Sequence, residues 1–80
     1  MAIRFREVIR EPIRLGFNRY ELIASPVGES DYRGEWRCPL CARGERSLIT
    51  YPRPAAALEW ARNCVLVHHL ATHPEADDLT

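Results

Sequence analysis

Alternating apolar and polar positions in the first third of the chain predict β-strands. Apolar side chains recur at every second residue in "IRF" and again in "IRLGF". A period of two places successive side chains on opposite faces of a strand, so Ile13, Leu15 and Phe17 would share one face. Residues 18–19 predict a two-residue turn into a second strand, "YELIA". The composition of residues 25–30, "SPVGES", predicts a loop.

The middle of the chain predicts a second hairpin with two cysteines at its turn. Apolar residues alternate with charged ones over residues 32–37, and residues 47–51 are rich in β-formers. Cys38 and Cys41 lie between these two segments in the sequence "CPLC". A hairpin with paired cysteines at its turn is a zinc knuckle, in which backbone N–H groups point toward the thiolates.

Residues 54–72 predict one long helix. Pro54 suits the first helical position, where its missing N–H has no partner in any case. The residues after it are strong helix formers without internal glycine or proline. Pro74 disfavours the α conformation at His73, so the helix should end one residue earlier. Residues 74–80 predict an acidic, flexible tail.

Composition narrows the class of protein. Hydrophobic residues make up 46% of the 80 residues, which is typical of a globular chain. No apolar run approaches the ~20 residues of a membrane span, and the start of the chain lacks a secretory signal, so we expect a cytoplasmic protein. Three cysteines in a reducing compartment favour metal binding over disulfides. All the basic residues are arginine, which is typical of a GC-rich genome such as that of an actinobacterium or its phage.

Two histidines near the end of the predicted helix complete a zinc ligand set. Zn²⁺ prefers a tetrahedron of thiolate and imidazole ligands. His69 and His73 are four residues apart, so a helix would place them on one face. Together with Cys38 and Cys41 they fill four positions and leave none for water, which predicts a structural site.

Two other histidine or cysteine pairs are alternatives. His68 with His73 also has an allowed ligand spacing. His68 shares the more apolar side of the helix with Ala61 and Val65, whereas His69 shares a side with Arg62. This observation favours His68, but the ligand spacing of His69 and His73 ranks that pair first. Cys64 with His68 is a third pair at helical spacing. Without a metal, histidines at a helix C-terminus would still interact favourably with the helix dipole.

The order strand, Cys-x-x-Cys, strand, helix, His-x-x-x-His resembles the two-cysteine, two-histidine (Cys2His2) zinc finger over residues 32–73. The residues that carry the resemblance are Cys38, Cys41, Leu66, His69 and His73. The resemblance implies ligand roles for the cysteines and histidines, and a core role for Leu66. Twenty-seven residues separate Cys41 from His69, against about 12 in the family.

The predicted fold class is α+β: a small antiparallel sheet with a zinc-knuckle hairpin and one long C-terminal helix. A chain this short buries a modest core, so a metal or a partner chain often adds stability. We expect one zinc-stabilised domain over residues 1–73. Residues 1–30 would form its N-terminal β region and residues 31–73 its zinc-finger-like unit.

The sequence favours regulatory binding to a protein partner, or self-association, without catalysis. The chain has no catalytic motif, and Cys64 lacks an orienting carboxylate, so we expect neither an enzyme nor a small-molecule substrate. The predicted helix is apolar on more than one side, which leaves surplus apolar surface for a partner. The weaker alternative is a structural subunit of a larger assembly.

Nucleic-acid binding is the main alternative function. Arginines recur at even positions in the N-terminal part and would line one face of an extended chain, and one more arginine lies on the helix. These residues are Arg4, Arg6, Arg10, Arg14 and Arg62. The zero net charge of the whole chain argues against binding through the entire surface.

Overall fold

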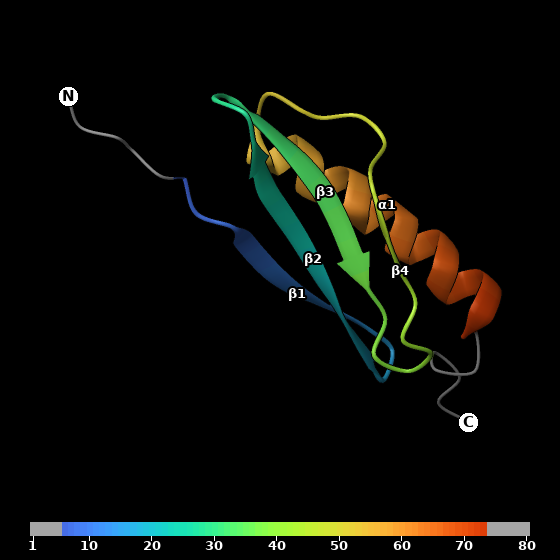
Figure 1. The fold of residues 1–80 in the computed structure, drawn as a ribbon. Coiled ribbons are helices and arrows are strands. Elements are labelled where there is room, and N and C mark those ends of the chain that lie inside the picture. Colours follow the sequence, from blue (N-terminus) through green and yellow to red (C-terminus); the bar gives the residue numbers. More distant parts are fainter. Residues whose placement is uncertain (1–5, 74–80) are drawn as a thin grey trace.

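The computed structural model describes residues 6–73, which form four strands followed by one helix. The elements are β1 (Ile9–Leu15), β2 (Asn18–Val27), β3 (Asp31–Arg37), β4 (Gly44–Arg46) and α1 (Pro54–Thr72). The strands form one antiparallel sheet in the order β1-β2-β3-β4, and α1 packs across one face of it (Figure 1). The predicted α+β class is confirmed. The predicted strand at residues 3–5 and the predicted tail at residues 74–80 lie outside the described residues.

The first hairpin turns two residues earlier than predicted. Leu15 pairs with Asn18, so the turn consists of Gly16 and Phe17, and Arg19 already belongs to β2. Gly16 has a φ of 60°, a conformation that glycine adopts at little cost because it has no Cβ. Tight hairpin turns need such a residue, and the prediction of a turn at residues 18–19 was therefore wrong. Phe17 lies at the exposed tip instead of on the inward face.

The hairpin formed by β2 and β3 is longer than the composition predicted. Residues 25–27 continue β2 and pair with residues 31–33 of β3. The turn is confined to residues 28–30, where Gly28 has a φ of 62°. Most of the predicted loop is therefore strand.

The strand that follows the cysteine turn begins earlier than the predicted residues 47–51. Strand β4 pairs with the end of β3, since Glu35 lies opposite Arg46. Beyond β4, Ser47 and Tyr51 still bond to backbone groups of β3, but residues 48 and 49 between them are exposed. The prediction of a strand over residues 47–51 was wrong, because the turn at residues 38–43 is short and pairing resumes directly after it.

The core lies between the sheet and every fourth residue of α1. Ala57, Ala61, Val65 and His69 are the buried helix residues, and this spacing places them in one stripe. Close approach is possible because Gly34 has no side chain: a Cβ there would lie 2.5 Å from the Ala57 carbonyl oxygen. The buried residues that the sheet contributes to the core cluster are Tyr20, Leu22, Trp36 and, at the end of β3, Cys38.

Helix α1 has the bounds that the sequence predicts. It begins at Pro54 and ends at Thr72, and the backbone N–H of His73 donates a hydrogen bond to the His69 carbonyl oxygen at 2.8 Å. No helix within residues 6–73 combines the length and the apolar character that crossing a bilayer requires. The end of α1 lies beside the cysteine turn, and this places the candidate site.

Candidate metal centre

Four side chains from two parts of the chain converge where α1 ends. The potential ligand atoms of Cys38, Cys41, His68 and His73 all lie within 4.8 Å of one another. The Cys38 Sγ lies 3.5 Å from the His73 Nε2, and the Cys41 Sγ lies 3.5 Å from the His68 Nε2. With Zn–S bonds of about 2.3 Å and Zn–N bonds of about 2.0–2.1 Å, a tetrahedral site has S···N edges of roughly 3.6 Å. The cluster could therefore bind a metal ion.

The cysteine turn is held by backbone hydrogen bonds. The Cys38 N–H donates to the Arg43 carbonyl oxygen at 2.7 Å and closes the turn. Ala42 has a φ of 56°, which costs a residue with a Cβ about 1–2 kcal/mol. The resulting backbone path directs the N–H groups of Leu40 and Cys41 toward the Cys38 sulfur. These are the donors that the zinc-knuckle prediction requires.

The surroundings of Cys38 favour its thiolate, which is the form that binds metals. Burial alone would raise the pKa of the Cys38 thiol. Hydrogen bonds from the Cys41 backbone, the Asn18 side chain and the Leu40 backbone outweigh burial, and the pKa is lowered. The Asn18 Nδ2 lies 3.6 Å from the Cys38 Sγ. Asn18 is not among the site residues that the sequence predicts, and its only signal is that it is a polar residue at an inward position of β2.

The surroundings of His68 favour a neutral ring, which is the form of histidine that binds metals. Burial lowers the pKa of His68, and the positive charges of His73 and Arg43 add to this effect. The His68 ring packs against the Trp36 indole at a centroid distance of 4.8 Å. This contact fixes the position of the imidazole beside the cysteine turn.

His73 reaches the cluster because the chain has left the helix at that residue. The His73 backbone has φ −127° and ψ 47°, outside the helical region. On a continued helix, His68 and His73 would point about 140° apart, since each residue turns about 100°. Pro74 disfavours a helical conformation at His73, and the His73 side chain can then turn toward Cys38.

The structure corrects the choice of the first histidine ligand. His69 is only 1% exposed, and its Nδ1 lies 2.7 Å from the Tyr20 hydroxyl oxygen. It continues the buried stripe of α1 against the sheet, and it is not part of the cluster. The structure therefore does not bring His69 together with the two cysteines, and His68, the alternative, lies in the cluster in its place.

Cys64 and Leu66 lie away from the cluster. Cys64 is half-buried against the core, where burial and the charge of Glu45 raise the pKa of its thiol. Leu66 is 38% exposed, so the core role that the zinc-finger resemblance implied is wrong. The helix turns Val65 toward the sheet instead.

Comparisons with protein-family models, curated proteins and solved structures find no match to the chain. The Cys2His2 character of this protein therefore rests on the geometry of its four side chains.

Of the first two predicted arginines, the one within residues 6–73 is engaged by the protein's own backbone and is not part of a free basic surface. Arg4 lies outside the described residues. Arg6 donates hydrogen bonds to three backbone carbonyl oxygens, at residues 27, 28 and 31, and its guanidinium stacks 4.7 Å from the Tyr32 ring centroid. Its contacts hold the turn between β2 and β3.

The remaining predicted arginines lie on two different faces of the protein. Arg10 forms an ion pair with Glu21, and Arg14 is exposed on the same strand. Arg62 lies on α1 and pairs with Glu11 at 2.9 Å. The helix covers the opposite face of the sheet from Arg10 and Arg14, so a single surface does not contain Arg62 together with them.

Proposed function

We propose that the protein is a small zinc-binding module in which zinc ties the cysteine turn to the end of α1. The observation that supports this is the approach of two sulfurs and two imidazole nitrogens within 4.8 Å of one another. Two thiolates and two imidazoles are a ligand set that structural zinc sites use. The lowered pKa values of Cys38 and His68 favour the forms that such a site needs.

The proposed site is structural, and the module is not an enzyme. A catalytic zinc keeps one coordination position open for water or substrate. Here four side chains would fill the tetrahedral shell, so the ion has no position at which to activate water. Its contribution is to join residues 38–41 to residues 68–73.

Native mass spectrometry tests the zinc proposal. The chain purified in the presence of zinc should carry one zinc ion, which acidification should release. Cys41→Ser should lose the ion, because it removes one of the four ligands. Cys64→Ser is the matched control and should keep it, since Cys64 lies outside the cluster. A bare-chain mass for the unsubstituted protein, or zinc loss from the Cys64→Ser variant, would contradict the proposal.

We further propose that the module acts by binding a protein partner through the outer side of α1. Leu66, Val67 and Leu70 are adjacent on the helix and are 38%, 69% and 65% exposed. Contiguous exposed apolar side chains of this kind mark interaction surfaces. We call these three residues the outer helix patch.

A capture experiment with matched variants tests the partner proposal. The zinc-loaded chain should retain a specific protein from a cell lysate. The double variant Val67→Ser/Leu70→Ser should not retain that protein. The control is the double variant Leu48→Ser/Ile49→Ser, because Leu48 and Ile49 are exposed apolar residues that do not belong to α1. Retention by both variants, or by neither, would count against binding through the outer helix patch.

A further inference from the structure

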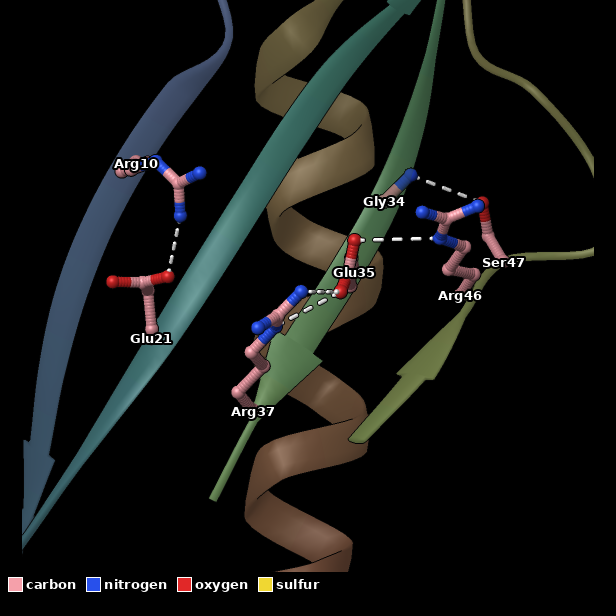
Figure 2. A network of polar contacts seen from close by, with 7 residues as sticks. All are labelled: Arg10, Glu21, Gly34, Glu35, Arg37, Arg46 and Ser47. Carbon is pink, nitrogen blue, oxygen red and sulfur yellow. Dashed lines mark hydrogen bonds and ion pairs between the residues drawn. The ribbon is translucent and has the colours of Figure 1, made fainter. Parts of the chain in front are cut away.

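The face of the sheet that α1 does not cover carries arginine on all four strands. Alternation and register place these residues on the side opposite Tyr20, Leu22 and Trp36, and we call this surface the open face. Its basic residues are Arg10, Arg14, Arg19, Arg33, Arg37 and Arg46, and its acidic residues are Glu21, Asp31 and Glu35. Figure 2 shows several of these residues on the strands, with α1 behind them. The chain as a whole has no net charge, so the open face is strongly positive relative to the rest.

Two of the three carboxylates of the open face are already engaged by arginine, and the third, that of Asp31, accepts a hydrogen bond from the Thr50 hydroxyl at 3.2 Å. Glu21 accepts a hydrogen bond from Arg10 at 2.7 Å, and Glu35 lies 3.0 Å from Arg37 and 3.5 Å from Arg46 (Figure 2). The Glu35 side chain is only 14% exposed, whereas those of Arg37 and Arg46 are 64% and 67% exposed. Solvent on this face therefore meets guanidinium groups more than carboxylates.

Two arginines face each other across the first hairpin without a compensating acid. Arg14 lies directly opposite Arg19, and both are exposed. Within residues 6–73, neither forms an ion pair with a carboxylate. Like charges at directly opposed positions destabilise a sheet. A local arrangement that costs stability and gains no internal contact is typical of a binding site.

A hollow beside this pair gathers further positive charge. Arg19, Arg37 and Arg43 line a cavity of about 640 Å³ that extends to the cysteine turn. The acidic residues of the lining, Glu21 and Glu35, are those already paired with arginine. The planar guanidinium group donates paired hydrogen bonds that match the oxygens of a phosphate group.

We propose that the open face, together with the hollow beside it, binds the phosphate backbone of nucleic acid, with Arg14, Arg19, Arg37 and Arg43 as the principal contacts. Stable protein–protein interfaces have an apolar core, which this charged face lacks, whereas phosphate contacts alone support nucleic-acid binding. The aromatic side chains of Tyr20 and Trp36 belong to the buried core, so they cannot stack on bases. Binding that rests on phosphate contacts is independent of base sequence, and it uses a surface on the other side of the sheet from the outer helix patch.

Fluorescence anisotropy with random-sequence duplex DNA tests this inference. Contact with three or four phosphates predicts a slope of log affinity against log salt of about −2.7 to −3.6. Affinity should then fall roughly 40- to 150-fold between about 50 mM and 200 mM salt. The double variant Arg14→Gln/Arg19→Gln should lower the magnitude of this slope by about two, because two phosphate contacts are lost. It should also bind more weakly at the lower salt.

A second double variant controls for net charge. Arg53→Gln with Arg62→Gln removes the same charge from residues at the start and in the middle of α1, and it should change the affinity less than about twofold. Zinc content is measured for each variant, so loss of the open face is distinguished from loss of the metal. Three outcomes would overturn the inference: no binding of duplex DNA at the lower salt, equal weakening by both double variants, or binding of poly-aspartate without binding of DNA.

Discussion

Removal of zinc is expected to unfold the C-terminal half of the protein, from the cysteine turn to the end of α1. Structural zinc contributes about 10–16 kcal/mol to the folding of small zinc-finger peptides, whereas whole domains are stable by only about 5–15 kcal/mol. Within residues 6–73, the hydrogen-bond and ring contacts of the His73 side chain are with Cys38 and His68, both members of the cluster. Without the ion, only weak sulfur–imidazole contacts of 3.5 Å join the cysteine turn to His68 and His73 within the cluster.

Circular dichroism of the chain before and after chelation measures this effect. The helical signal should fall on zinc removal and return when zinc is added back. Cys38→Ser should show the same loss without chelator, and Cys64→Ser should behave like the unsubstituted chain, since only Cys38 is a proposed ligand. An unchanged helical signal, with metal analysis confirming that zinc is gone, would show that the core holds α1 without the ion.

The helix and the cysteine turn could be predicted because their signals are local. Pro54 and Pro74 bracket the helix in the sequence, and the observed bounds are Pro54–Thr72. The spacing of Cys38 and Cys41 needs only a tight turn to bring their sulfurs together. Neither inference depends on how distant parts of the chain pack.

The rotation of the helix could not be predicted, because several of its sides are apolar. The side that faces the sheet is decided by tertiary contact. Gly34 lets the backbone of β3 approach Ala57 closely, and the stripe that begins at Ala57 then leads to His69. His68 is thereby turned toward the flank of the helix where the cysteine turn lies. The preference for His69 assumed that both histidines lie within the helix, yet Pro74 already indicated that His73 lies beyond it.

Replacing His68 by glutamine is expected to weaken zinc binding by at least about a hundredfold. Loss of a residue that only supports a ligand typically costs 10- to 100-fold in metal affinity, and loss of a ligand should cost more. The His68 Nε2 is the atom that lies 3.5 Å from the Cys41 Sγ, and the glutamine amide is not among the donors that zinc prefers. Competition for zinc with a chromophoric chelator measures the affinity.

The same substitution at the neighbouring residue provides the control and has a different expected effect. His69→Gln should keep zinc affinity within a few-fold, because the His69 ring lies in the core and bonds to the Tyr20 hydroxyl. It should instead lower the free energy of unfolding by roughly 1–2 kcal/mol, through a weakened buried hydrogen bond and poorer packing. Urea unfolding of both zinc-loaded variants measures this change. If His69→Gln lost zinc while His68→Gln retained it, the assignment of the ligands would be reversed, and the helix would have to turn a different side toward the sheet.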